Sequence, residues 1–320
     1  MSNANNTGGA DKRGIENLRG VIPASQIPRR LALWQVALLA AAILVPPAGI
    51  AQTPASDAFH FAILGDRTGE AEPGVYERVW QEVAAEHPAF VVSVGDTIQG
   101  LNDATADAEW RQVQRILAPF RTYPLYLAPG NHDIWSDLSE RGFQKYAGHP
   151  PHYSFDYAQA HFTVLDNSRS DELSAEEMAF LERDLEVHKA QPVKFIVSHG
   201  PSWLIPVILE DSNFPLHQVA KKYGVRYVIA GHLHQMLHVD LDGVMYLSMA
   251  SSGGHLRASG KYEDGWFFGD TRVDVRGADV EFRIEELKAP YGQGRITAPL
   301  DWGKAGLTKL NAGHPSQVGR

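Results

Sequence analysis

Short apolar runs alternate with amphipathic segments from residue 58 onward, and several of these runs end at a glycine beside a polar residue. Strands are predicted for residues 59–64, 90–94, 123–127, 193–197, 226–230, 244–249, 266–275 and 280–284. Helical apolar spacing is present at residues 75–87, 106–117 and 174–188. A hairpin is predicted for residues 153–157 and 161–165. Strands that alternate with helices in this way predict an α/β fold.

The folded part is predicted to be one domain at residues 56–287. Ser174 and Glu177 have the spacing of a capping box, so the helix at residues 174–188 is expected to begin there. The tail at residues 288–320 has no clear periodicity and is predicted to be irregular. No internal repeat is present that would indicate a solenoid or an array.

The N-terminal part of the chain follows a different pattern. Residues 1–28 are polar and rich in Asn and Gly, which predicts a disordered extension. Two arginines precede an apolar run and small residues, so residues 29–51 are predicted to be a secretory signal peptide. The run at residues 31–45 is shorter than the about 20 residues of a membrane span, and an uncleaved membrane anchor is the alternative. We therefore expect export to the periplasm or beyond the cell, with no stable membrane span after cleavage.

Composition narrows the chemistry further. The chain has no cysteine, which excludes disulfides, thiolate ligands and cysteine nucleophiles. Its formal net charge is −9 without a basic patch, so duplex nucleic acid is not expected as a partner. It has 14 histidines, and their positions matter most for function.

Polar residues capable of binding metal follow five of the predicted strands. The five segments are Gly65 to Gly69, Gly95 to Gly100, Gly130 to Asp133, Ser198 to Pro201 and Gly231 to His234. Ligand sites of α/β sheets lie at the carboxyl ends of strands. Each segment alone also fits a tight turn, but their joint occurrence favours one shared site. Carboxylate, amide oxygen and imidazole together suit Mn, Fe, Zn or Ni, and Mg is a further option.

With these segments the chain resembles the calcineurin-like metallophosphoesterases, which include purple acid phosphatases and cyclic-nucleotide phosphodiesterases. The resemblance covers residues 59–252. It implies a four-layer α/β/β/α sandwich of two mixed β-sheets flanked by helices, with two divalent metal ions at one end.

The resemblance also implies roles for individual residues. The bridging ligand of the two metals would be Asp96, and the two metal sites would be completed by Asn131, His199 and His232 on one side and by Asp66 and His234 on the other. His132 would donate a proton to the leaving oxygen or bind the phosphate, and Asp133 would orient His132.

One position departs from the family pattern. The first motif of the family has a histidine where this chain has Thr68. Purple acid phosphatases, which also lack that histidine, supply a tyrosine at the position of Gln99. The amide oxygen of Gln99 is therefore a candidate ligand, and one well-formed site and one weaker site are expected.

Further candidates surround these motifs. Arg67 is predicted either to clamp a phosphate oxygen or to pair with Glu70 or Glu72 on the surface. The segment at residues 251–255 either lines the substrate pocket or is a plain loop. Trp135 and Trp203 either form walls of the cleft or pack in the core. The remaining histidines, including His161 and His188, are expected to lie away from other ligands.

We therefore predict a metal-dependent hydrolase of small phosphorylated substrates, monoesters or diesters, that uses a metal-activated water. A metal-dependent binding or sensing protein with weakened catalysis is the alternative, motivated by Thr68. The presence of His132 and Asp133 argues against it, because a protein that only binds needs no acid for a leaving group. A structural exported module would leave the array of ligands unexplained.

Overall fold

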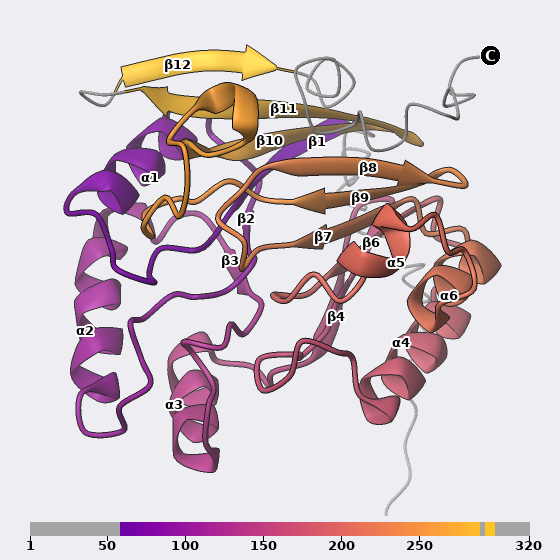
Figure 1. The fold of residues 1–320 in the computed structure, drawn as a ribbon, viewed down its shortest axis with the longest axis horizontal. Helices are drawn as coiled ribbons and strands as arrows, with labels where there is room; N and C mark the ends of the chain where they lie inside the picture. The colour runs from indigo at the N-terminus through magenta and orange to yellow at the C-terminus, as the bar shows by residue number, and fades with distance from the viewer. Residues whose placement is uncertain (1–57, 289–291, 298–320) are drawn as a thin grey trace, which may run out of the picture. The chain divides into compact units, whose positions relative to one another are not determined.

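Two six-stranded sheets form the centre of the computed structural model, which describes residues 58–288 and 292–297 (Figure 1). The first sheet has the order β12-β11-β10-β1-β2-β3, with β1 Ala58–Leu64, β2 Val91–Ser93, β3 Leu125–Leu127, β10 Phe268–Arg276, β11 Asp279–Lys288 and β12 Gly292–Thr297. The second has the order β4-β5-β6-β7-β9-β8, with β4 Tyr153–Tyr157, β5 Ala160–Val164, β6 Val193–Val197, β7 Tyr227–Ala230, β8 Leu237–Leu241 and β9 Val244–Ser248.

Both sheets are mixed, as predicted. The strands β1, β2 and β3 run parallel, as do β5, β6, β7 and β9, whereas β10, β11, β12, β4 and β8 pair antiparallel. Parallel strands place all their carboxyl ends at one edge of the sheet. The loops that carry the predicted ligands therefore emerge together from each sheet.

Alternating side chains of each strand divide the core into layers. In β1, Phe61 and Ile63 pack between the two sheets, while Ala62 and Leu64 face the helices outside the first sheet. In β7, Tyr227 and Ile229 pack between the sheets in the same way. This is the period-2 alternation of a pleated strand that is buried on both faces.

Helices cover the outer face of each sheet (Figure 1). The first sheet is flanked by α1 Val75–Ala85 and α2 Ala106–Ile116, and α2 packs with α3 Asp137–Ala147. The second sheet is covered by α4 Ala175–Val187, α5 Leu204–Ile208 and α6 Pro215–Tyr223. Two 3₁₀ turns lie at Ala118–Phe120 and Tyr262–Asp264. The predicted four-layer α/β/β/α sandwich is confirmed.

Two local predictions differ from the structure. The tail was expected to be irregular from residue 288, but β12 pairs antiparallel with β11 as an edge strand. Its sequence, GQGRIT, contains one large apolar residue, so backbone pairing forms this strand without a hydrophobic pattern. At α4, Ser174 accepts from Glu177 N at 3.1 Å, but the Glu177 carboxylate binds His152 and Asp166 N instead of closing a capping box.

The predicted N-terminal extension, the predicted signal peptide and residues 298–320 lie outside the described residues. Among the described residues, no helix combines the length and the apolar character that crossing a membrane requires.

Candidate metal centre

The predicted ligands lie on loops that follow five parallel strands. Asp66 follows β1, Asp96 follows β2 and Asn131 follows β3, while His199 follows β6 and His232 and His234 follow β7. The structure brings these six residues together, and we call them the ligand cluster. Both sheets thus contribute to one site, as expected for strand ends that share an edge.

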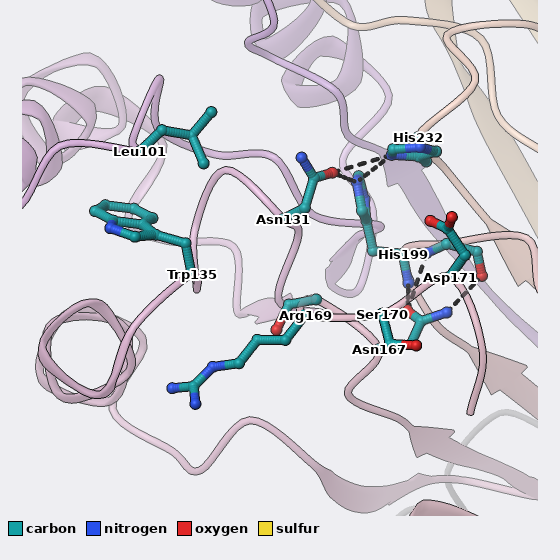
Figure 2. Close-up of a pocket in the computed structure, with 11 residues that line it drawn as sticks. Leu101, Asn131, Trp135, Asn167, Arg169, Ser170, Asp171, His199 and His232 are labelled. Carbon is teal, nitrogen blue, oxygen red and sulfur yellow. Dashed lines mark hydrogen bonds between the residues drawn. The ribbon is translucent and has the colours of Figure 1, made fainter. Parts of the chain in front are cut away.

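One half of the ligand cluster is held around an amide oxygen. The Asn131 Oδ1 atom lies 3.0 Å from His199 Nε2 and 3.0 Å from His232 Nδ1 (Figure 2). The His199 Nε2 atom lies 3.2 Å from Asp96 Oδ1. One atom of each of Asp96, His199 and His232 lies within 4.8 Å of the others. Two imidazoles, a carboxylate and an amide thus face one point, a donor set suited to a borderline divalent cation.

The other half shares Asp96. Ligand atoms of Asp66, Asp96 and His234 lie within 4.8 Å of one another, and His234 Nε2 is 3.8 Å from Asp66 Oδ1. All three side chains are fully buried. Because Asp96 belongs to both groups and has two oxygens, its position matches that of a bridging ligand.

Three buried atoms of the ligand cluster have no hydrogen-bond partner among the described residues: Asp66 Oδ2, Asp96 Oδ2 and His234 Nε2. The second oxygen of each carboxylate is occupied, because Asp66 Oδ1 accepts from His232 N at 2.9 Å and Asp96 Oδ1 from His132 N at 3.0 Å. An unpaired buried polar atom costs about 1–3 kcal/mol. A bound divalent cation would supply the missing partner of all three, so these residues fit a metal.

Backbone carbonyls fix the orientation of two of the imidazoles. The Nδ1 atom of His199 lies 2.8 Å from Val94 O, and that of His234 lies 2.7 Å from His255 O. A carbonyl accepts, so each Nδ1 carries a proton, and with a cation bound each Nε2 would direct its lone pair at the cluster. Metal-binding histidines are commonly held in this way by a partner on their other nitrogen.

The backbone is strained at four of the six ligands. Positive φ angles occur at Asp66 (49°), Asp96 (55°), His232 (68°) and His234 (59°). Residues other than glycine rarely adopt positive φ angles, and strained conformations of this kind are common at functional sites. Gly130 allows the close approach, because a Cβ atom there would lie 2.2 Å from Asp96 Oδ1.

The charges in the ligand cluster are poorly balanced without a cation. Burial raises the pKa of Asp66 to about 7, and the nearby Asp96 charge adds to this effect. Burial opposes ionisation of Asp96 as well, but the His199 imidazolium holds its pKa below the ordinary value. Burial lowers the pKa of His234 to about 4, so this ring is a neutral donor. A buried pair of carboxylates beside a neutral imidazole favours a divalent cation.

Thr68 and Gln99 bond to each other. Thr68 Oγ1 donates to Gln99 Oε1 at 2.6 Å, and Glu70 N donates to the same oxygen at 3.2 Å. Both acceptor positions of that amide oxygen are therefore in use. Coordination of a metal by Gln99 would require one of these two bonds to break.

His132 is held differently from the prediction. Its Nδ1 donates to Gln99 O at 2.5 Å, whereas the Asp133 carboxylate accepts from the backbone N–H groups of Thr97, Ile98 and Gly130. The prediction that Asp133 orients His132 is therefore wrong. Burial raises the pKa of Asp133 to about 7 although three N–H groups favour its carboxylate. Asp133 joins the loops after β2 and β3.

No ion pair of Arg67 with Glu70 or Glu72 is found among the described residues, and its role as a phosphate clamp stays a prediction. Its Nη1 donates to Thr97 O at 3.1 Å, and its guanidinium lies 5.7 Å from the centre of the Tyr76 ring. The segment at residues 251–255 supports the first motif, because Ser251 Oγ and Gly254 N both donate to Asp66 O. Trp203 is buried in the core beneath the second sheet.

Asn167 is a supporting residue that sequence reasoning missed. Its Oδ1 accepts from His199 N at 3.2 Å and Gly200 N at 2.9 Å, and its Nδ2 donates to Gly200 O at 2.8 Å. These bonds fix the loop that carries His199. Asn167 follows β5, so its place after a buried strand was a signal that could have identified it.

A second group of histidines and carboxylates was also missed. His161, expected to lie apart from other ligands, contacts Asp156 through Nδ1 at 2.7 Å and Asp184 through Nε2 at 2.8 Å. The ring of His188 stacks on His161 at 3.9 Å with 16° between the planes. We call these four residues the brace. Ligand atoms of Asp156, His161 and His188 lie within 4.8 Å of one another. Both nitrogens of His161 already contact carboxylates, however, and the lone pairs of stacked rings lie in nearly parallel planes, so the two imidazoles do not face one ion as they stand.

Comparison with known proteins gives consistent matches. The model of the calcineurin-like phosphoesterase family matches residues 59–236. A 3',5'-cyclic adenosine monophosphate phosphodiesterase of Escherichia coli (strain K12) is 27% identical over 208 residues, which are 60% of this chain and 70% of that protein.

Solved structures share the fold. The purple acid phosphatase PPD1 of yellow lupin has a TM-score of 0.55 at 17% identity, with 76% of this chain and 53% of that chain covered. This chain therefore spans about half the length of the lupin enzyme. GAP50, the anchor in the inner membrane complex of Plasmodium, has a TM-score of 0.51 at 16% identity, with 82% of this chain and 99% of that chain covered.

Proposed function

This chain belongs to the calcineurin-like phosphoesterase family and is a metal-dependent phosphoesterase, and from that premise we propose that it hydrolyses small phosphomonoesters or phosphodiesters at the ligand cluster. The observation that carries the proposal is the convergence of three buried, unpartnered atoms, Asp66 Oδ2, Asp96 Oδ2 and His234 Nε2. Divalent ions bound there would lower the pKa of water and neutralise phosphoryl charge. Candidate ions are Mn, Fe, Zn, Ni and Mg.

The protein side chains have separate tasks in this reaction. Asp96 would hold both ions, Asn131, His199 and His232 would complete one site, and Asp66 and His234 would complete the other. When His132 is protonated, its Nδ1–H binds Gln99 O and its Nε2–H is free to pass a proton to the leaving oxygen. A carbonyl cannot take the proton from Nδ1 at neutral pH, so the bond fixes the ring while Nε2 acts.

The two metal sites should differ in strength. The site with Asn131, His199 and His232 has four protein ligands when Asp96 is counted, and the site with Asp66 and His234 has three. Progressive chelation, followed by elemental analysis, should therefore remove one ion before the other. Because the Gln99 oxygen already accepts from Thr68 and Glu70, Gln99→Ala should leave two ions bound. Loss of the second ion in that variant would show that Gln99 is a ligand.

The experiment that tests the function is reconstitution. Purified protein is chelated, reloaded with each candidate ion, and assayed on p-nitrophenyl phosphate, bis-p-nitrophenyl phosphate and 3',5'-cyclic AMP. The cyclic diester is included because the Escherichia coli relative is named for it. We expect turnover that chelation abolishes and at least one ion restores. Metal binding without turnover of any substrate would instead support the alternative, a binding protein with weakened catalysis.

We also propose that the protein is exported. The support is the pattern at residues 29–51, where two arginines precede an apolar run and small residues. Fractionation of cells that make the full chain, with N-terminal sequencing, should find it in the periplasm or medium without residues 1–51. An intact chain in the membrane fraction would support the uncleaved anchor.

A further inference from the structure

A cavity of about 430 Å³ opens beside the ligand cluster (Figure 2). Its lining includes Asn131, His199 and His232, so it opens directly onto the metal centre. This volume suits a small organic ligand. The residues that line the rest of the cavity therefore decide which alcohol of a phosphoester fits there.

One wall of the cavity is apolar. Leu101 and Trp135 lie on the same side of it, across from His232 (Figure 2). Leu101 is 57% exposed and has a φ angle of 59°. Burial therefore stabilises this leucine only in part, and its Cβ disfavours this backbone conformation. Strain of this kind persists where the surroundings impose it, and it is characteristic of functional sites.

The contacts of Gly100 show what imposes the positive φ angle on Leu101. A Cβ atom at Gly100 would lie 1.7 Å from His132 O and 2.7 Å from the Trp135 ring. The turn that carries Leu101 is therefore pressed against the loop that carries His132 and Trp135. This contact holds the two loops together, and both apolar side chains line the cavity.

The apolar wall lies on the same two loops as the leaving-group acid. His132 lies on the same loop as Trp135. Its Nδ1 donates to the backbone oxygen of Gln99, which lies on the same turn as Leu101. His132 is not among the residues that line the cavity, but a leaving oxygen near it would place its organic group over these two loops. Leu101 and Trp135 are the side chains that this group would meet.

The lining of the cavity offers no free cation to a second anionic group. Among the described residues that line it, Arg169 is the one permanent cation, and its guanidinium binds Asp137 at 3.1 Å and Glu140 at 2.9 Å. Its side chain extends away from His199 and His232 (Figure 2). Asp171 adds a carboxylate to the lining. A phosphate or carboxylate on the alcohol would thus meet no uncommitted positive charge among the residues that line the cavity. Arg257 does not line it, but its charge acts on His232, whose pKa is lowered by burial and also by Arg257.

We propose that this cavity selects phosphoesters whose leaving alcohol is uncharged and has an apolar or aromatic face, and that Leu101 and Trp135 determine this specificity. The inference rests on the proposed function and gives it a substrate class. Apolar contact accounts for discrimination of roughly 10-fold to 100-fold at one side chain.

The test compares substrates of matched reactivity. Two aryl phosphodiesters are prepared whose leaving phenols have equal pKa, one neutral and one with an added carboxylate, together with a small alkyl ester. The wild-type protein, loaded with the ion that supports turnover, should have a kcat/KM roughly 10-fold higher for the neutral aryl ester than for the charged one.

The matched variant is Leu101→Asn, because asparagine tolerates a positive φ and removes the apolar surface without adding strain. It should reduce kcat/KM for the neutral aryl ester roughly 10-fold, mainly through KM, and leave the alkyl ester unchanged. Trp135→Phe should retain the preference, and Leu209→Asn, at a leucine that is 71% exposed and does not line the cavity, should have no effect.

The outcomes separate the two proposals. Turnover with equal rates for neutral and charged esters, or an equal effect of Leu101→Asn on all three substrates, overturns the specificity and leaves the phosphoesterase function intact. Absence of turnover of every ester with every ion overturns both.

Discussion

The ligand cluster and the brace contain the same kinds of side chain, histidine and aspartate, yet they differ in two respects. In the brace the buried polar atoms are paired: Asp184 accepts from Ser154, His161 and Thr163, and His188 donates to the backbone oxygen of Asp184. In the ligand cluster three buried atoms have no partner among the described residues. Proximity of ligand-type residues therefore does not by itself indicate a metal. Unsatisfied atoms that converge do.

The backbone shows the same difference. The brace residues lie in or directly after regular elements, with Asp156 in β4, His161 in β5, Asp184 in α4 and His188 at the C-cap with a φ angle of −99°. Ligands of the cluster lie in loops, four of them at positive φ. The brace residues are not among the residues with positive φ, so their backbone conformations are ordinary, whereas four of the ligands are held in a strained conformation.

Substitution of Asp96 is the most direct test of the difference between the ligand cluster and the brace. Asp96→Asn removes one charge from both metal sites, so activity should fall by at least about 1,000-fold, the scale expected when a charge-stabilising group is lost. Elemental analysis should show less than two ions bound. Asp156→Asn, which changes a brace carboxylate in the same way, should keep full activity and metal content. An active Asp96→Asn variant would mean that the cluster is not the site.

His132 tests the chemistry without disturbing the metals. His132→Ala should lower kcat by roughly 100- to 10,000-fold while both ions stay bound. The loss should be larger for an alkyl leaving group than for nitrophenolate, because a good leaving group needs no proton. His188→Ala, a histidine of the brace, is the matched control and should not change kcat. An equal loss for both leaving groups would indicate that His132 binds phosphate and does not act as an acid.

Most of the ligand cluster could be predicted from the sequence, because the signals that identify it lie in short segments of the chain. Glycine beside a polar residue after a buried strand marks a loop at a strand end, and strand ends of parallel sheets meet. The brace was not accessible, because His161 and Asp184 lie in a strand and a helix that meet only in the folded chain. The bond between Thr68 and Gln99, the role of Asp133 and the pairing of β12 likewise depend on contacts between distant segments.

The brace should affect stability and leave catalysis unchanged. Burial opposes the charge on His161, but bonds to Asp184 and Asp156 outweigh it and raise its pKa. Asp184, buried but bonded to His161, has a lowered pKa. Asp184→Asn should therefore destabilise the protein by about 3 kcal/mol at pH 6, the scale of a broken buried pair.

The sign of the pH effect follows from these two shifts. The contribution of His161 is present below its ordinary value of 6.5 and is lost as pH rises through the raised pKa, while that of Asp184 is lost as pH falls below 3.8. Urea unfolding should give the largest difference between wild type and variant from about pH 4 to pH 6.5. A difference that grows towards pH 9 would contradict a charged brace. Activity per folded molecule should not change.

Glu285 provides a third case beside the ligand cluster and the brace, because it has an unpartnered buried oxygen but no histidine or second unpartnered atom described as facing the same point. Its Oε1 has no partner among the described residues, and burial, with the charge of Glu86, raises its pKa to about 7. Its cross-strand neighbour on β10 is Asp270, whose pKa burial also raises. Arg272 and Arg283 lower the pKa of Glu285 without cancelling these effects.

A folded-state pKa above the ordinary 4.5 means that stability present at low pH is lost as pH rises through about 7. Glu285→Gln should therefore stabilise the protein by roughly 2 kcal/mol at pH 8 and leave it unchanged at pH 4, measured by urea unfolding. Glu281→Gln, an exposed position on the same strand, is the control and should have no effect at either pH. Stabilisation that persists at pH 4 would show that the Glu285 side chain destabilises the fold through its packing and not through its charge. If Glu285→Gln gains stability only at high pH and binds as much metal as the wild type, a single unpartnered buried oxygen destabilises the fold. A metal site would then require several unpartnered atoms that face one point.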